Sequence, residues 1–202
     1  MSFWDERYGE PGYAYGTEAN DFLAAEALRI PKGRVLCLAE GQGRNAVYLA
    51  QLGYDVVAVD LSPVGLEKAK TLAEQRGVSI QTQVADLNDF EIGSGAWQGI
   101  VSISAHFPPA LRAKVHRRVV EGLAPGGVLI LEAYGPRHHE IGGVGGPPPG
   151  QGEMLMALEA LRLEFLGLAL VQAREIEREV NEGKYHRGLS GVVQVVGVKE
   201  KG

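Results

Sequence analysis

Short apolar runs alternate along the first two thirds of the chain with segments whose apolar residues recur at helical spacing. Such runs are typical of buried strands, and the spaced segments are typical of amphipathic helices. The expected strands are 34–39, 55–59, 78–84, 98–103 and 128–133, and the expected helices are 18–29, 44–52, 62–77 and 108–122. Strands that are apolar on both faces and alternate with helices predict a parallel sheet covered on each side. The fold class is therefore α/β and doubly wound.

The last third of the chain has a different pattern. Residues 135–152 contain seven glycines and four prolines, so no regular element is expected there. A helix is expected over 153–166, followed by two long strands, 173–180 and 186–198, joined by a short polar turn. This pattern predicts an antiparallel hairpin that closes the sheet. No linker divides the chain, so we expect a single domain over 1–202, with 1–30 as an N-terminal segment and helix and 135–152 as a lid loop.

Two glycines follow the first expected strand, and an acid ends the second. Gly41 and Gly43 let the backbone pass close to a ligand, because a Cβ at either position would collide with it. The helix that starts at once offers unpaired N–H groups to a polar ligand. Asp60 is placed to accept hydrogen bonds from the two hydroxyls of a ribose. The arrangement predicts a site for an adenosine-type cofactor.

Composition narrows the classes of partner. The chain has 202 residues and a net charge of −5, which argues against a nucleic-acid partner. No apolar run is long enough to span a membrane, and the N-terminus has no secretion signal. Cys37 is the single cysteine and lies in an expected buried strand, so a cytoplasmic location is expected. The basic residues of the fourth helix are expected to form a solvated face; they are Arg112, Lys114, Arg117 and Arg118.

The loop from Gly41 to Ala46 also matches the dinucleotide pattern, which alone is weak evidence. Three features point away from NAD: Asp86 after the third strand, the Pro125-Gly-Gly127 turn before the fifth, and the closing hairpin. With these features, residues 3–198 resemble the class I S-adenosylmethionine-dependent methyltransferases. The resemblance implies a mostly parallel, seven-stranded, Rossmann-like sheet that ends in an antiparallel hairpin. It also implies S-adenosylmethionine as cofactor, with Asp60 on the ribose and Asp86 on the adenine side.

Within that family, the glycine loop and its aliphatic helix are similar to the tellurite-resistance (TehB-like) and thiopurine/thiol methyltransferase branch. The aromatic segments 4–8 and 15–18 resemble the N-terminal cover over the cofactor in that branch. The family usually has an acid where Cys37 stands and a glycine where Ala39 stands. Glu40 is therefore our candidate partner for the cofactor ammonium, the alternative being a solvent-facing loop glutamate. The expected cofactor-binding residues are Tyr8, Tyr15, Ala39, Glu40, Gly41, Gly43, Asn45, Asp60, Leu61, Asp86, Leu87 and Ser104.

Methyl transfer from a sulfonium needs alignment and exclusion of water, and needs a base only for an acceptor that keeps its proton. His106 follows the fourth strand at the ligand edge of the sheet and is the candidate catalytic base, with Phe107 as a wall of its pocket. The alternative is that His106 bonds the cofactor or caps the next helix. His138 and His139 are adjacent and without a carboxylate or cysteine cluster, so no metal is expected. Arg137 is either a substrate contact or a solvated loop residue.

The expected function is methyl transfer to a small-molecule thiol, hydroxyl or metalloid oxyanion, by a monomer or homodimer. Two other classes stay open at this point. The first is a non-catalytic protein that binds S-adenosylmethionine, which the intact glycine loop and both acids disfavour. The second is an NAD-dependent oxidoreductase, although the chain lacks a Tyr-x-x-x-Lys proton relay. Fold alone does not decide among them.

Overall fold

The computed structural model describes residues 2–201 and contains one seven-stranded sheet of order β3-β2-β1-β4-β5-β7-β6. The first five strands are parallel, and the last two form an antiparallel hairpin beside β5. The strands are β1 (Arg34–Leu38), β2 (Asp55–Asp60), β3 (Gln81–Val84), β4 (Trp97–Ile103), β5 (Leu123–Tyr134), β6 (Leu168–Glu182) and β7 (His186–Lys199). This is the sheet that the sequence predicts, with its closing hairpin.

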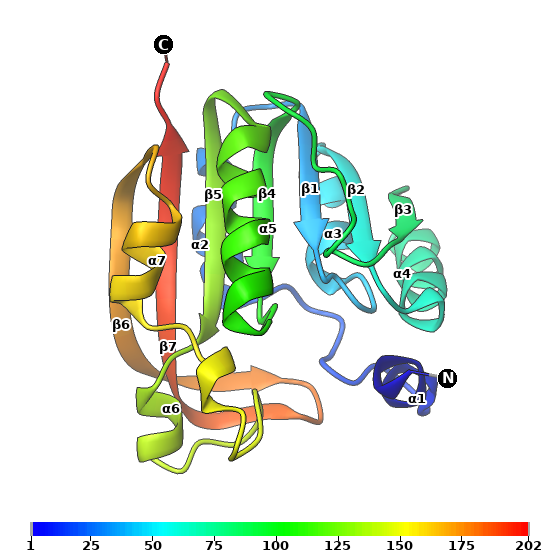
Figure 1. Cartoon of the computed structure of the whole chain (residues 1–202). Helices are drawn as coiled ribbons and strands as arrows, with labels where there is room; N and C mark the ends of the chain where they lie inside the picture. The colour runs from blue at the N-terminus through cyan, green and yellow to red at the C-terminus, as the bar shows by residue number, and fades with distance from the viewer. Residues whose placement is uncertain (1, 202) are drawn as a thin grey trace.

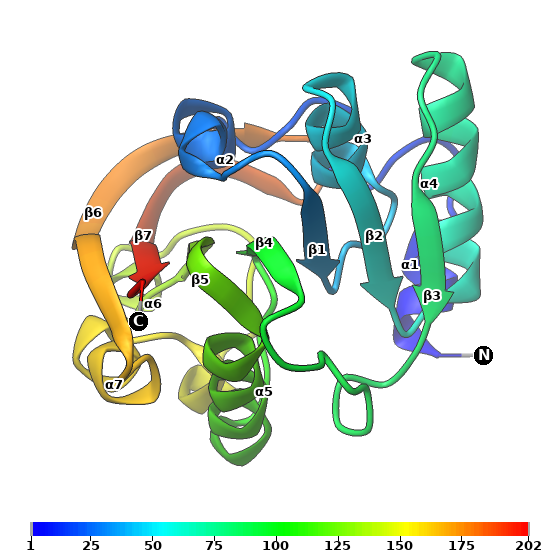
Figure 2. The ribbon, with the colours of Figure 1, turned by 90° about the horizontal axis from the view of Figure 1, so that it is seen from above.

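Helices cover both faces of the sheet (Figure 2). The helices are α1 (Phe3–Gly9), α2 (Asp21–Glu26), α3 (Arg44–Gln51), α4 (Pro63–Gln75), α5 (Pro109–Gly122), α6 (Arg137–Glu140) and α7 (Leu158–Glu164), with 3-10 turns η1 (Ala27–Arg29) and η2 (Gly152–Met154). On one face, α2 packs against β5 and α3 against β2, through side chains such as Leu23 and Leu49. On the other face, α5 and α7 bury Val115, Val119 and Phe165. None of the helices in residues 2–201 is long and apolar enough to cross a membrane.

The boundaries of several elements differ from the sequence expectation for local reasons. The helix expected from Glu18 begins only at Asp21, because the Asn20 side chain caps it by accepting from the Leu23 N–H. The helix expected over 153–166 is split into η2 and α7. The expectation that 135–152 holds no regular element is wrong, since α6 forms there. β6 is longer than predicted and runs along the whole of β7.

The expectation that the basic residues of α5 form a solvated face is wrong for two of the four. Arg112 is buried and makes a two-pronged ion pair with Glu164 at the end of α7. Arg118 donates to three backbone carbonyls in the segment between β3 and β4. These guanidinium groups therefore fix neighbouring segments, whereas Arg117 is exposed as expected.

Candidate active site

The parallel strands end at the lower edge of the sheet in Figure 1, and the glycine loop lies there. Asp60 is the last residue of β2, and its two carboxylate oxygens accept from the Gly41 and Ser62 N–H groups, each at 2.8 Å. Asp60 thus ties the glycine loop to the start of α4. Burial raises its pKa, and those backbone bonds lower it in part. A carboxylate has further lone pairs after two such bonds, so Asp60 can still accept from ribose hydroxyls.

Gly41 and Gly43 both have positive φ, of 61° and 87°, which suits glycine. Their surroundings differ. A Cβ at Gly41 would lie 2.5 Å from the Tyr8 hydroxyl, whereas a Cβ at Gly43 would lie 2.5 Å from the Ala69 Cβ on α4. Sequence analysis gave both glycines the same reason, close approach to a ligand. At Gly43 the protein itself occupies that space, so this glycine is required for packing α3 against α4.

Glu40 precedes the first loop glycine and is only 9% exposed, so the alternative of a solvent-facing glutamate is wrong. Its Oε1 accepts from the Asn45 and Ala46 N–H groups, at 3.0 and 2.8 Å, and satisfies the start of α3. Burial raises the pKa of Glu40 to about 7. A cationic group beside a buried carboxylate stabilises its charged form and lowers its pKa. The loop therefore offers a place for the ammonium of a zwitterionic ligand, and that role stays a prediction.

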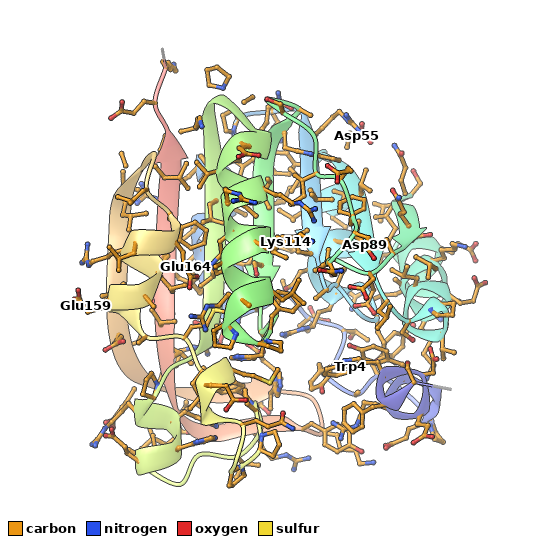
Figure 3. All side chains as sticks on the ribbon, in the orientation of Figure 1. Trp4, Asp55, Asp89, Lys114, Glu159 and Glu164 are labelled. Carbon is orange, nitrogen blue, oxygen red and sulfur yellow. The ribbon has the colours of Figure 1, made fainter. Side chains whose placement is uncertain are left out.

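The N-terminal helix lies over the glycine loop. Tyr8 is buried between Gly41 and Gly65, and Trp4 stacks on it with the ring centroids 5.6 Å apart. Asp5 accepts from the Ser62 hydroxyl at 2.6 Å and fastens α1 to the start of α4. Figure 3 places Trp4 at the strand ends, whereas Asp55 lies at the opposite edge of the sheet. Desolvation beside Asp60 raises the pKa of the Tyr8 phenol, which stays neutral.

The other predicted cofactor residues lie in varied surroundings. Ala39 has a φ of 49° and Ser104 one of 55°, at the ends of β1 and β4. The Asn45 side chain accepts from the Asn20 N–H at 2.9 Å and so positions the start of α2. Asp86 is exposed beyond β3, where it accepts from the Asn88 N–H. Three positions complete the set: Tyr15 near the hairpin, Leu61 exposed after β2, and Leu87 packed in the core below α5.

His106 has partners on both ring nitrogens. Nδ1 lies 3.0 Å from the Met154 carbonyl oxygen, and Nε2 accepts from the Tyr134 N–H at 3.3 Å. This pattern sets the neutral tautomer with the proton on Nδ1. Desolvation lowers the pKa of His106 to about 4. In this conformation neither nitrogen is free to take a proton from an acceptor, and the ring instead joins η2 to the end of β5. Phe107, expected as a pocket wall, packs against the core.

Two adjacent histidines form hydrogen bonds within segment 135–152. His138 Nε2 lies 3.2 Å from the Gly145 carbonyl, and His139 Nε2 lies 2.8 Å from that of Pro147. Within residues 2–201 no cluster of metal-ligating side chains is found. The guanidinium of Arg137 forms ion pairs with Glu177 and Glu140. The histidines therefore order the loop.

A buried polar network that sequence reasoning missed lies behind this edge. We call it the Glu132–Glu182 network, and its members are Asn20, Arg44, Glu132, Arg178, Glu182 and Gln194. Asn20 Nδ2 donates to the carboxylates of Glu132 and Glu182, each at 2.7 Å. Arg178 Nη2 donates to the same two carboxylates, at 2.5 Å to Glu132 and 3.1 Å to Glu182. Arg44 pairs with Glu182 at 2.6 Å, and Gln194 donates to Glu132 at 2.6 Å. It joins α2, α3 and β5 to the hairpin.

A narrow crevice lies between this network and the strand ends, too tight for a water molecule. It is lined by Ser104, Glu132, Ala133, Tyr134, Val180, Glu182 and Val192. Rings surround Tyr134 on several sides: the ring centroid of His138 lies 4.0 Å away, that of His186 5.3 Å and that of His106 5.7 Å.

The comparisons with known proteins agree with this geometry. Residues 35–127 match the family described as a methyltransferase domain. The 2-heptyl-1-hydroxyquinolin-4(1H)-one methyltransferase of Mycobacteroides abscessus is 31% identical over 105 residues, which are 50% of this chain and 46% of that protein. The glycine/sarcosine N-methyltransferase of Halorhodospira halochloris is 29% identical over 134 residues, 64% of this chain and 47% of that one. The chain spans about half the length of the curated relatives it matches.

Solved structures show the same fold at low identity. The enzyme that converts a disulfide bond into a thioacetal group in echinomycin biosynthesis superposes with a TM-score of 0.74 at 20% identity, over 98% of this chain and 91% of that one. TehB from Haemophilus influenzae gives 0.72 at 20% identity, over 98% and 66%. The [4+2]-cyclase SpnF gives 0.68 at 16% identity, over 98% and 91%. The sheet is the Rossmann-like methyltransferase fold.

Proposed function

We propose, from the membership of residues 35–127 in the methyltransferase domain family, that this chain is an enzyme that transfers a methyl group from S-adenosylmethionine to a small-molecule acceptor. The observation that carries the proposal is the joint placement of Asp60 and Glu40 on either side of the glycine loop. One carboxylate suits a ribose and the other, buried with a raised pKa, suits an ammonium. The two ends of S-adenosylmethionine carry these two groups.

The residues present fit that cofactor. When bound, it supplies an activated methyl group on a sulfonium. Asp60 would hold the ribose, Glu40 the ammonium and the Gly41 backbone the part between them. Tyr8 and Tyr15 would cover the ligand and exclude water, and Asp86 would accept from the adenine. His106, whose nitrogens are both engaged, would position η2 and β5 and leave proton transfer to another group.

We also propose three classes of methyl acceptor. A thiol, a hydroxyl or a metalloid oxyanion each suits the closed, ring-lined edge beside Tyr134. TehB is a neighbour by fold alone, so the TehB-like branch is one candidate within this set. The relatives' names favour methyl transfer over NAD-dependent oxidation. SpnF, titled a [4+2]-cyclase, shares the fold, so a turnover assay must separate methyl transfer from other uses of this scaffold.

Asp60→Ala is expected to weaken S-adenosylmethionine binding by about 1.5–3 kcal/mol, the range for hydrogen bonds to a charged group. The reason is the loss of the ribose acceptor together with the bond that shapes the loop at Gly41. Isothermal titration calorimetry with S-adenosylmethionine and S-adenosylhomocysteine measures the change. Asp55→Ala, at the exposed other end of the same strand, is the matched control and should bind as the wild type does. If Asp60→Ala and Asp55→Ala bind S-adenosylmethionine equally tightly, Asp60 does not contact the cofactor.

Residues 3–16 and 135–152 are expected to exchange amide hydrogens more slowly when S-adenosylhomocysteine is bound. Tyr15 of the first segment lies against His186, and Gly145 of the second lies against Tyr134, so we expect both segments to open for a ligand and to close over it. Hydrogen exchange followed by mass spectrometry, with and without the ligand, tests this expectation. The α5 helix lies on the outer face of the sheet and serves as an internal reference (Figure 2). If the exchange rates of both segments stay unchanged although the ligand is shown to be bound, these segments do not close over it.

A further inference from the structure

His186 is the first residue of β7 and lies where the closing hairpin reaches below the strand ends (Figure 1). The residue is 7% exposed, and its ring contacts Tyr15 of the N-terminal segment, with the centroids 4.3 Å apart. On another side the ring meets Tyr134 of β5. A Cβ at Gly145 of segment 135–152 would come within 3.0 Å of the His186 Cδ2 atom. The N-terminal cover, β5 and the lid segment therefore all converge on this imidazole.

The two nitrogens of His186 have different surroundings. Nδ1 is buried without a hydrogen-bond partner and lies 3.8 Å from Glu182 Oε2. Burial raises the pKa of Glu182, but the neighbouring His186 and the ion pairs with Arg44 and Arg178 outweigh it and hold this pKa below the ordinary value, so Glu182 stays ionised. A carboxylate facing Nδ1 favours the tautomer with the proton on Nδ1. Nε2 is then the lone-pair nitrogen, and the polar contact found for this ring among residues 2–201 is the one from Nδ1 to Glu182.

The other histidines of the chain are engaged in structural bonds. His106 has two partners, and His138 and His139 each bond a carbonyl of the lid segment. His116 bonds Glu164 between α5 and α7, away from the strand ends. His186 is thus the imidazole at this edge that combines a facing carboxylate with an unengaged nitrogen. This is the arrangement of a general base whose protonated form a nearby carboxylate stabilises.

Desolvation lowers the pKa of His186, and the nearby Arg44 and Arg7 guanidinium groups lower it further, while Glu182 raises it in part. Tyr15 and Tyr134 also face the ring, and burial keeps both phenols neutral by raising their pKa values. The imidazole is therefore uncharged at neutral pH and able to accept a proton. A protonated ring there would be stabilised by the Glu182 carboxylate.

We propose that His186 Nε2 accepts the proton of a protic methyl acceptor, an O–H or S–H group, while the facing Glu182 carboxylate stabilises the imidazolium that forms. The inference rests on the proposed methyl transfer and names the acceptor class within it. A lone pair of the acceptor oxygen or sulfur forms the new bond to the methyl carbon as the carbon–sulfur bond of the sulfonium breaks. The electron pair of that bond stays on the departing sulfur. The acceptor proton moves to Nε2, and the imidazolium later releases it to water. An oxyanion acceptor would need no such base.

The tautomer gives a test that does not depend on turnover. Long-range proton–nitrogen NMR of the uniformly 15N-labelled protein, with the His186→Gln spectrum for assignment, should show a neutral ring with its proton on Nδ1 at pH 7. The pKa from a titration should lie below the ordinary 6.5. A ring that carries its proton on Nε2, or that is charged at pH 7, would overturn the proposal.

Turnover with two probe thiols separates proton removal from positioning. Benzyl mercaptan is protonated at neutral pH, whereas 4-nitrothiophenol is already ionised. His186→Gln is expected to lower kcat/KM for benzyl mercaptan by about 10²-fold or more, and to leave that for 4-nitrothiophenol within about threefold. For the wild type, the rate with benzyl mercaptan should rise with pH through the lowered pKa of His186. The variant should lack this rise. His106→Gln and the matched control His116→Gln should both keep it.

The outcomes distinguish this inference from the proposed function. A wild type that binds no S-adenosylmethionine in calorimetry defeats the proposed function itself. If the wild type binds S-adenosylmethionine but methylates neither thiol, the acceptor is not of the protic class, and the proposed role of His186 as a base is overturned. Equal losses for both thiols in His186→Gln, with cofactor affinity unchanged, assign the ring to positioning and overturn its role as base.

Discussion

Arg178→Met is expected to destabilise the protein by about 3–5 kcal/mol, the cost of breaking a buried ion pair by removing one partner. Arg178 donates to both Glu132 and Glu182, whose side chains are 4% and 7% exposed. Without the Arg178 guanidinium, Asn20 would still donate to both carboxylates. The two negative charges would then repel each other, and Arg44 beside Glu182 would be the remaining arginine of the network. Urea denaturation followed by circular dichroism measures the change.

The effect should depend on pH in a defined direction. The folded-state pKa of Glu182 is held below its ordinary 4.5, so its contribution to stability is present above that value and is lost as pH falls towards the lowered one. In Arg178→Met this pKa rises, because the carboxylate loses a cation. The stability gap between wild type and variant should therefore narrow as pH falls below about 4.5.

Arg174→Met is the matched control for this variant. Arg174 lies on β6 four residues before Arg178 and is exposed. It donates to Gln194, a neutral member of the network, and no hydrogen bond or ion pair to Glu132 or Glu182 is found for it among residues 2–201. Its loss should cost no more than about 1 kcal/mol, as for exposed pairs. Equal costs for the two variants, or no narrowing of the gap at low pH, would show that the Glu132–Glu182 network does not hold the hairpin to the sheet.

The glycine loop and Asp60 are predictable from sequence because the signal is local. A strand, a turn that requires positive φ and the helix after it occupy consecutive positions, so periodicity and residue type suffice to place Gly41 and Gly43. The buried position of Glu40 is less accessible to such reasoning. Its exposure depends on α1 and on the start of α3 closing around it, and a loop glutamate is exposed by default.

The hairpin chemistry could not be predicted in this way. Asn20 meets Glu182 across 162 positions of sequence, and Tyr15 meets the ring of His186 only because both covering segments fold onto the same edge. In sequence, Glu182 belongs to an ordinary polar turn and His186 begins the expected strand after it. His106, by contrast, stands directly after an apolar strand and was singled out by position, although its nitrogens bond Met154 and Tyr134. Position after a strand indicates proximity to the site but not which ring nitrogen is free.

Gly43→Val is expected to lower the free energy of unfolding by about 2–5 kcal/mol, combining overpacking with the strain of a β-branched residue at positive φ. The new Cβ would lie 2.5 Å from the Ala69 Cβ and 2.8 Å from its backbone Cα, so α4 must move away from α3. The damage therefore falls on the fold, where sequence reasoning expects a collision with ligand and an intact fold. Loss of cofactor binding should follow from the shift of α4 and not from direct contact.

Gly77→Val separates the two causes. Gly77 also has a positive φ, 68°, but a Cβ there meets nothing within 4 Å, so its variant carries the strain without the collision. Thermal and urea unfolding should show the larger loss for Gly43→Val, and Ala69→Gly in the same chain should restore part of it by removing one of the two colliding atoms. If Gly43→Val and Gly77→Val lose equal stability, and Ala69→Gly restores nothing, then α3 and α4 do not require a glycine at position 43 for packing. The ligand-collision reason for this residue would then be the better one.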